Sequence, residues 1–241
     1  MISWETLAQA ARRLQTTELN VAREYCQHLF LRAFYSERGS EHVMFKGGTA
    51  LRIIYGSLRF SEGLDFSGLR LRVKQIEDWV SSAASEMERE AILVSIEESK
   101  ATSGGYLGIL SCPVHDLPVQ IQLQISLRQR SEVAGRGVVV TPDFLPAYTL
   151  TQLLEELIVG EKLAAVVSRR KARDYYDLYL MLRKGMISPE MMSSLGRVRT
   201  ALAKGTIDFD QDLGPFLPRN QATLVREFPR VLLEELARHG V

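Results

Sequence analysis

The spacing of hydrophobic positions changes twice along this chain of 241 residues. Apolar residues recur at helical intervals over residues 4–14 and 18–35, and this pattern predicts two N-terminal helices. A mixed region follows, in which the pattern predicts an amphipathic helix over residues 75–90 and about four or five strands. From Thr151 onward the pattern is almost entirely helical, and it predicts helices over residues 152–169, 172–183, 189–202 and 224–238.

The mixed region contains one strand whose two faces differ clearly. Between Pro118 and Leu127, apolar and polar side chains alternate as they do in a strand with one buried face. The apolar positions are Val119, Ile121, Leu123 and Ile125, and the polar positions are Gln120, Gln122, Gln124 and Ser126. The polar face is consistent with an open site, but a solvated sheet face explains it equally well and is favoured when nothing else is known. Shorter runs predict further strands at residues 42–45, 64–66, 91–96, 106–112 and 138–140.

These patterns predict an α+β fold in two parts. Residues 1–148 form a core in which two helices precede the mixed region, and residues 149–241 form a helical C-terminal domain. The boundary follows residues 142–148, where the composition changes in a way typical of a linker. A turn rich in Gly and Ser is predicted at residues 99–105.

Composition narrows the class of protein. The chain is 46% hydrophobic and 24% charged, as in an ordinary soluble protein, and its formal net charge of +1 provides no overall positive field for nucleic acid. Any such binding must therefore come from local basic clusters. The two cysteines, Cys26 and Cys112, lack the spacing of a metal site or a disulfide framework, which favours a reducing, cytoplasmic setting. Secretion and membrane insertion are not expected, because the sequence shows neither a signal-like start nor an apolar stretch of membrane-spanning length.

The densest chemistry lies between Phe45 and Phe66. Gly47 and Gly48 permit a sharp turn after a short strand and let the backbone approach a ligand closely. Thr49 is placed to cap a following helix over residues 50–55, whose N-terminus favours an anion such as phosphate. Asp65 is flanked by large apolar residues, so this carboxylate is expected to be capped, paired or bound to a metal.

A second cluster lies between Glu161 and Asp177. Lys162 stands in an apolar run, where its amine needs an anion or a carboxylate. A basic corner follows at Arg169, Arg170, Lys171 and Arg173, and then two carboxylates at Asp174 and Asp177. Basic runs of this kind are usually solvated turns between helices, and this is the simpler interpretation of the basic corner. An ion-pair network that pins two helices together would explain Lys162, Asp174 and Asp177, so a structural and a catalytic interpretation both stay open here.

Taken in order, the two clusters resemble the AbiEii/AbiGii toxin family of nucleotidyltransferases, which includes the MenT toxins. The resemblance is carried by Lys46-Gly47-Gly48-Thr49-Ala50-Leu51, Arg59-Phe60-Ser61, Leu64-Asp65-Phe66, Glu161-Lys162-Leu163, Arg173-Asp174 and Asp177-Leu178. It implies a polymerase-beta-like nucleotidyltransferase core, with a small mixed sheet and flanking helices, and a helical C-terminal part. It also implies transfer of nucleotides from a nucleoside triphosphate to RNA, with tRNA acceptor ends as the best-fitting target, under control of a cognate antitoxin protein.

The resemblance also implies a role for each residue. Nucleotide binding falls to Lys46, Gly47, Gly48, Thr49, Ser61, Lys162 and Arg173, and RNA binding to Arg169, Arg170 and Lys171. The catalytic set is Asp65, Lys162, Asp174 and Asp177, with Asp65 as the ligand of Mg²⁺ or Mn²⁺. Such a set suits phosphoryl transfer, which depends on positioning and on cations that neutralise phosphate charge.

One position departs from the family pattern of a carboxylate, an apolar residue and a second carboxylate. This chain has Gly63-Leu64-Asp65, and Glu62 cannot replace the missing group because neighbouring strand residues point to opposite faces. The candidates for a third ligand, Gln120, Gln122 and Gln124, carry no charge. Two functions therefore remain: a nucleotidyltransferase toxin of a type IV-like toxin–antitoxin or abortive-infection system, and a catalytically degenerate nucleotide- or protein-binding module.

Overall fold

The chain divides into two compact units in the computed structural model, which describes residues 1–128, 134–203 and 207–240. Unit 1 comprises residues 1–56 and 60–154. Unit 2 comprises residues 155–241 together with the short segment 57–59. The three residues Ser57–Arg59 thus belong to unit 2, although the sequence on both sides of them belongs to unit 1.

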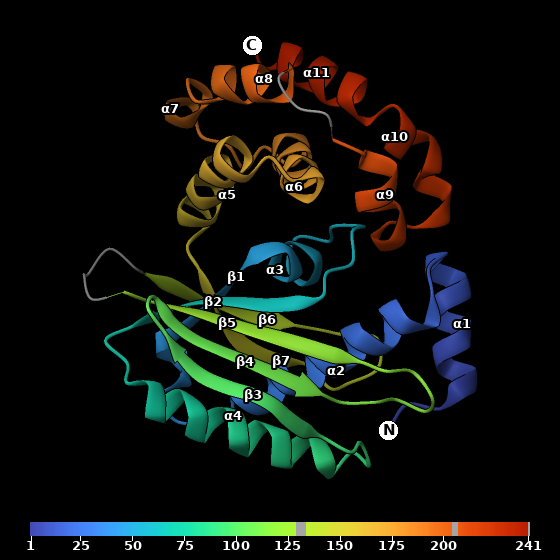
Figure 1. The fold of residues 1–241 in the computed structure, drawn as a ribbon, viewed down its shortest axis with the longest axis vertical. Coiled ribbons are helices and arrows are strands. Elements are labelled where there is room, and N and C mark those ends of the chain that lie inside the picture. The colour runs from blue at the N-terminus through green and yellow to red at the C-terminus, as the bar shows by residue number, and fades with distance from the viewer. Residues whose placement is uncertain (129–133, 204–206, 241) are drawn as a thin grey trace. The chain divides into compact units, whose positions relative to one another are not determined.

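Unit 1 is built on a mixed sheet that has seven strands within the described residues (Figure 1). The strands are β1 (Val43–Lys46), β2 (Gly63–Leu69), β3 (Ser95–Thr102), β4 (Gly105–Ser111), β5 (Gln120–Arg128), β6 (Gly135–Val140) and β7 (Tyr148–Leu153). Their order across the sheet is β3-β4-β5-β2-β1-β7-β6. β2 pairs in parallel with β5, and β1 pairs in parallel with β7, whereas the other neighbours are antiparallel. The predicted α+β class is confirmed.

Two strands differ from the expectation from sequence. β3 lies later than the predicted strand at 91–96, and only Ser103 and Gly104 form the turn that follows it. Because β3 is a largely exposed edge strand, its hydrophobic pattern is weak. β7 occupies residues for which a linker and the start of a helix were predicted. Its Gln152 is fully buried, so a polar residue interrupts the apolar pattern of the strand, and the predicted helix begins only at Glu155.

The alternation predicted for β5 is confirmed. Ile121, Leu123 and Ile125 are buried in the core of unit 1, whereas the side chains of the intervening glutamines are exposed. β2 follows the same rule, because Leu64 and Phe66 are buried on the core side. This alternation places Gly63 and Asp65 on the opposite face of the sheet.

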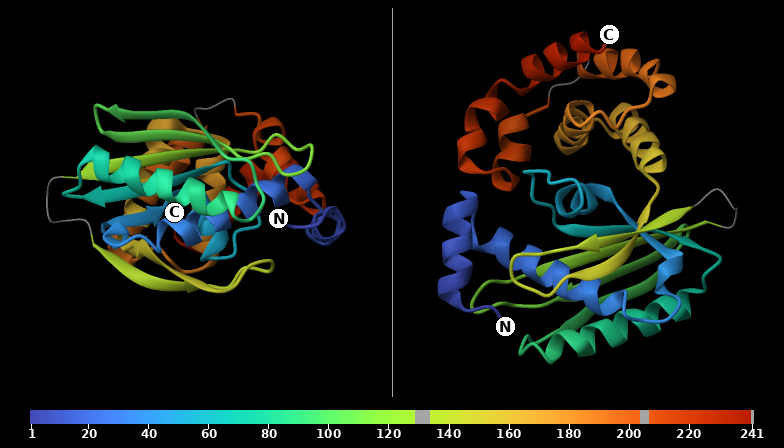
Figure 2. Two further views of the ribbon diagram at one scale, coloured as in Figure 1. Left: turned by 90° about the horizontal axis from the view of Figure 1, so that it is seen from below. Right: turned by 180° about the vertical axis from the view of Figure 1, so that it is seen from behind.

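Helices cover the sheet of unit 1 on both sides. They are α1 (Trp4–Leu14), α2 (Glu18–Phe34), α3 (Gly47–Ile53) and α4 (Val73–Glu88). The first two match the predicted helices, and each begins where a hydroxyl side chain, Ser3 or Thr17, accepts a hydrogen bond from a backbone N–H of its first turn. α4 lies on one side of the sheet and α3 on the other (Figure 1 and Figure 2). In this core, the ring of Phe34 on α2 packs against Phe66 of β2 and against Trp79 of α4.

The described secondary structure of unit 2 is all helical. Its helices are α5 (Glu155–Arg169), α6 (Ala172–Arg183), α7 (Pro189–Met192), α8 (Leu195–Ala203), α9 (Phe209–Leu213), α10 (Ala222–Arg226) and α11 (Phe228–Arg238). Aromatic rings of α6, α9 and α11 pack together at Tyr176, Phe209 and Phe228. In the described parts of both units, no helix combines the length and the apolar character that a membrane crossing requires.

A buried histidine of unit 1 makes the stability of the fold sensitive to pH. Nδ1 of His28 lies 2.8 Å from the hydroxyl of Tyr148, and burial, reinforced by the charge of Arg52, lowers the pKa of His28 from 6.5 to about 4. At pH values between 4 and 6.5, His28 therefore binds a proton more tightly in the unfolded chain than in the folded chain. The stabilisation by neutral His28 is complete above pH 6.5 and is lost as the pH falls through about 4.

We expect the free energy of unfolding to fall by about 3 kcal/mol between pH 7.5 and pH 4 because of His28 alone. The variant His28→Gln should be less stable than the parent at pH 7.5, and the gap should narrow as the pH falls. Urea unfolding of both proteins across this range measures the effect. A gap that stays constant with pH would show that His28 does not titrate between the folded and unfolded states.

Candidate functional site

The glycine turn and Asp65 come together in unit 1. Lys46 ends β1, and Gly47 begins α3 with a φ of +82°, which is a left-handed conformation that favours glycine. A Cβ atom placed on Gly47 would lie 2.3 Å from Oδ2 of Asp65. Position 47 therefore requires glycine for two reasons, and the Asp65 carboxylate lies directly against the backbone at the start of α3.

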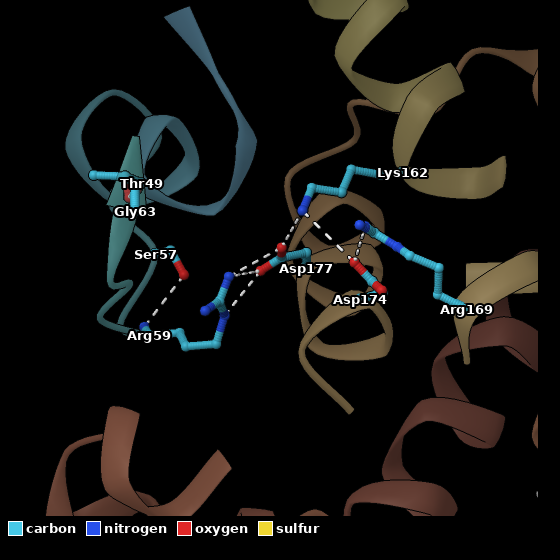
Figure 3. Close-up of polar contacts among 8 residues, drawn as sticks. All are labelled: Thr49, Ser57, Arg59, Gly63, Lys162, Arg169, Asp174 and Asp177. Carbon is cyan, nitrogen blue, oxygen red and sulfur yellow. Dashed lines mark hydrogen bonds and ion pairs between the residues drawn. The ribbon is translucent and has the colours of Figure 1, made fainter. Parts of the chain in front are cut away.

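Thr49 has a different place from the one expected. The sequence predicts Thr49 as the cap of a helix that starts at Ala50, but α3 begins at Gly47 and Thr49 lies within its first turn. The Thr49 side chain is buried, and its hydroxyl donates a hydrogen bond to the backbone carbonyl of Gly63 (Figure 3). This bond fixes α3 to the start of β2. Any contact of Thr49 with a phosphate would have to come from its backbone N–H.

Asp65 lies in a row of paired residues that crosses three strands. Lys46 of β1 is opposite Asp65, and Gln124 of β5 is opposite Asp65 on the other side. In the next row, Gly63 is opposite Gln122. Residues paired in this way share a face of the sheet, so the glutamine face of β5 is continuous with Asp65. The sequence-based link between these two features is supported by the register.

The donor set around Asp65 does not fit a resident divalent metal. Its neighbours on this face are a lysine, a glycine and a glutamine, whereas Mg²⁺ and Mn²⁺ are held chiefly by anionic oxygens. No group of three or more His, Cys, Asp or Glu side chains that could hold a metal occurs among the described residues. Space at position 63 is also limited, because a Cβ there would lie 3.0 Å from the backbone oxygen of Gln122.

The loop before β2 is held from two helices of unit 1. Gln27 of α2 donates a hydrogen bond of 2.9 Å to the carbonyl of Ser61. Arg52 of α3 lies over the ring of Phe60, with its guanidinium carbon 3.7 Å from the ring centre, and its Nε donates to Glu24 of α2 at 2.5 Å. These contacts give the backbone around Ser61 a defined position.

In unit 2, a buried carboxylate is shared by two cations. Asp177 of α6 is fully buried. Nε and one terminal nitrogen of Arg59 donate to its Oδ1 at 3.0 and 2.9 Å, and the same terminal nitrogen lies 3.0 Å from Oδ2 (Figure 3). Nζ of Lys162 on α5 donates to Oδ2 at 2.6 Å.

Burial raises the pKa of Asp177, but the attraction of Arg59 and Lys162 outweighs burial and holds the pKa below its usual value. Arg59 and Lys162 therefore stabilise the ionised form of Asp177.

Asp174 lies one turn earlier on α6 and is also buried. Its Oδ1 accepts a hydrogen bond of 3.0 Å from Arg169 and lies 3.9 Å from Nζ of Lys162. Its Oδ2 is buried without a hydrogen-bond partner. Lys162, with 12% of its side chain exposed, thus stands between two carboxylates, of which Asp177 is the closer.

The basic corner between α5 and α6 is exposed. Arg169, Arg170, Lys171 and Arg173 all present exposed side chains there. Arg170 adopts a φ of +54°, which turns the chain sharply between the two helices. α6 follows directly, so these cations stand at a helix N-terminus, where the helix dipole adds to their positive potential. This end of unit 2 therefore favours an anion.

Comparison with known proteins identifies the family. The description "Nucleotidyl transferase AbiEii toxin, Type IV TA system" matches residues 29–237. The chain belongs to the AbiEii family of nucleotidyltransferase toxins. Members of this family are the toxins of type IV toxin–antitoxin systems, so a partner antitoxin is implied. Among curated proteins, none matches the sequence.

Solved structures agree with this fold. JHP933 of Helicobacter pylori has a TM-score of 0.57 at 20% identity, over 93% of this chain and 96% of that protein. MenT4, a nucleotidyltransferase toxin of Mycobacterium tuberculosis, has a TM-score of 0.65 at 15% identity, over 99% of this chain and 88% of that toxin. At such low identities the likeness establishes the fold and not the substrate.

The residues predicted for the AbiEii site fall into two groups. Unit 1 holds Lys46, Gly47, Gly48, Thr49, Ser61 and Asp65, and unit 2 holds Lys162, Arg169, Arg170, Lys171, Arg173, Asp174 and Asp177. Sequence reasoning gave no role to Arg59, which binds the fully buried carboxylate of Asp177. The available signal was Asp177 itself, since a carboxylate on an apolar helix needs a charged partner.

The contact between Gly47 and Asp65 can be tested with a matched pair of glycines. Gly56 also has a positive φ, +67°, but a Cβ there would meet nothing within 4 Å. We expect Gly56→Ala to lower the free energy of unfolding by about 1–2 kcal/mol, the cost of the left-handed backbone. Gly47→Ala should cost at least about 1 kcal/mol more, because the carboxylate must also move. Equal losses in urea unfolding would mean that Asp65 does not press against the turn.

Proposed function

We propose that this AbiEii chain transfers nucleotides from a nucleoside triphosphate to RNA in the cytoplasm, with the acceptor end of tRNA as the target, and that a cognate antitoxin protein restrains it. The observation that carries the proposal is the charge arrangement around Lys162. In this network the three cations Arg59, Lys162 and Arg169 contact the carboxylates of Asp174 and Asp177. Two of these cations, Arg59 and Lys162, are largely buried, and buried positive charge favours a ligand with negative charge, such as a triphosphate.

The roles proposed in unit 1 concern the nucleotide. Lys46 and the backbone of Gly47 and Gly48 contact the phosphates at the start of α3, and the Ser61 hydroxyl adds a contact from a loop that Gln27 holds in place. Asp65 faces the same turn. Phosphoryl transfer needs little covalent chemistry from the protein, so this arrangement acts by positioning and electrostatics.

The roles proposed in unit 2 concern charge. Lys162 contacts a phosphate as a point charge, and Asp174 and Asp177 hold its ammonium from one side. Asp177 does not act as a general base, because its pKa is lowered and both its oxygens accept hydrogen bonds. The exposed Arg169, Arg170, Lys171 and Arg173 offer contacts to the RNA backbone, which dominates the affinity for nucleic acid.

A labelling assay tests the transfer. The full chain, incubated with bulk tRNA, each labelled nucleoside triphosphate in turn and Mg²⁺ or Mn²⁺, should label tRNA at its 3′ end. We expect Asp65→Ala to reduce labelling at least about 100-fold, as removal of a charge at a reacting centre does. Asp78→Ala, an exposed carboxylate on α4 that pairs with Lys74, should leave labelling unchanged. Absence of label from all four triphosphates, in conditions where a known active toxin labels the same tRNA, would contradict the proposal.

A second candidate function is a degenerate member of the family that binds a nucleotide or a protein without transfer. The observation that favours it is the loss of charge around Asp65, where Gly63 and Gln124 stand at positions able to carry carboxylates. In this case the site retains its phosphate contacts but has no group to support catalysis.

Restoring charge distinguishes the two candidates. Gly63→Asp and Gln124→Glu each add a carboxylate on the face of Asp65, and each should raise the affinity for Mn²⁺ about tenfold or more. Gln120→Glu, on the same strand face but opposite Ser111, serves as the control and should have little effect. Electron paramagnetic resonance of free Mn²⁺ measures the binding.

Because a Cβ at position 63 is close to Gln122, the Gln124 variant provides a second test if Gly63→Asp folds poorly. If neither variant binds Mn²⁺ better than the parent, a missing carboxylate does not limit this site.

A further inference from the structure

Arg59 belongs to the charge network around Lys162, but the function proposed above gives it no effect of its own, and its side chain is deeply buried. Only 5% of the side chain is exposed. Its backbone N–H donates to the hydroxyl of Ser57 at 3.2 Å, which braces the short segment 57–59 of unit 2. The guanidinium then meets Asp177 with the parallel geometry that arginine forms with carboxylates.

This contact divides the charge of Asp177 between two partners. A single carboxylate balances one cation, and Asp177 is bound by both Arg59 and Lys162. Arginine remains protonated at any ordinary pH. The pairing with Arg59 is therefore permanent, and Asp177 neutralises Lys162 only in part. The other carboxylate near Lys162, Asp174, lies further away at 3.9 Å and is hydrogen-bonded to Arg169.

We infer that Arg59 is a positioning residue that keeps the Lys162 ammonium only partly neutralised and thereby able to bind a triphosphate. Without Arg59, Asp177 and Lys162 would form an ion pair with no net charge. With Arg59, the three groups together carry one positive charge in a buried place, where an anion is bound most strongly. This inference rests on the proposed function for the identity of the ligand, but it assigns Arg59 a specific effect on Lys162 that the proposal does not contain.

The geometry also explains why an arginine stands at position 59. Two nitrogens of one rigid plane reach Asp177, and this leaves the outer side of Oδ2 to Lys162. A lysine would supply the same charge as a single point and would hold the carboxylate less firmly. Charge and geometry can therefore be separated by substitution.

The experiment measures binding of inorganic tripolyphosphate to the full chain by isothermal titration calorimetry, without RNA or nucleotide. We expect Arg59→Gln to weaken binding about tenfold or more, because Lys162 then pairs fully with Asp177. The double variant Arg59→Gln with Asp177→Asn removes one charge of each sign and should recover affinity to within about threefold of the parent.

Arg59→Lys keeps the charge and should also bind within about threefold, with a lower melting temperature. Arg183→Gln, which removes an exposed arginine of the same unit that pairs with Glu235, is the control and should bind like the parent.

Recovery in the double variant separates an electrostatic role from a structural one, since a purely structural Arg59 would leave that protein no better than Arg59→Gln. Unchanged affinity in Arg59→Gln, no recovery in the double variant, or no binding of tripolyphosphate to the parent would each overturn the inference. If Arg59→Gln does not fold, Arg59→Lys decides: retained binding supports the charge role and loss of binding overturns it. Failure of tRNA labelling with intact tripolyphosphate binding would instead count against the proposed function alone.

Discussion

The shared carboxylate of Asp177 is the interaction on which unit 2 depends. It is fully buried, and it connects α6, α5 and the segment 57–59 through Lys162 and Arg59. Removal of Asp177 would leave two buried cations without their shared partner, whereas removal of one cation leaves the carboxylate paired with the other. The same property makes it suitable for function, because a network of fixed charge holds a lysine in one place without the reorganisation that solvent would require.

Unit 1 shows the opposite arrangement, in which charge is sparse. Asp65 faces the glycine turn from a sheet face that otherwise offers amide groups and a lysine. The carboxylate and the turn are fitted so closely that the residue at position 47 has no freedom to change. The family, the fold and the turn are thus those of a nucleotidyltransferase toxin, but none of the described residues paired with Asp65 or Gly63 supplies a second carboxylate.

Sequence reasoning reached the parts of the fold that repeat a simple pattern. Helices α1 and α2 and the two faces of β5 follow from hydrophobic spacing. The stretch 45–66 was recognised as dense in chemistry, but the contact of Gly47 with Asp65 inside it was not predicted. Sequence reasoning failed where a single residue breaks the pattern. Gln152 is buried inside β7, and the exposed edge strand β3 has little apolar signal. Arg59 was missed for another reason: Asp177 on its apolar helix requires a cation, but the partner is 118 positions away and nothing in the sequence identifies which cation it is.

The assignment of Ser57–Arg59 to unit 2 has a consequence for how this protein is made and divided. The helical unit is not a continuous piece of chain, since one of its buried cations is contributed by a segment that precedes most of the sheet. A fragment that begins at Glu155 would contain Asp177 and Lys162 but not Arg59. During synthesis the ribosome delivers Arg59 long before its carboxylate exists, so the helical unit reaches its final state only after the chain has joined an early residue to a late one.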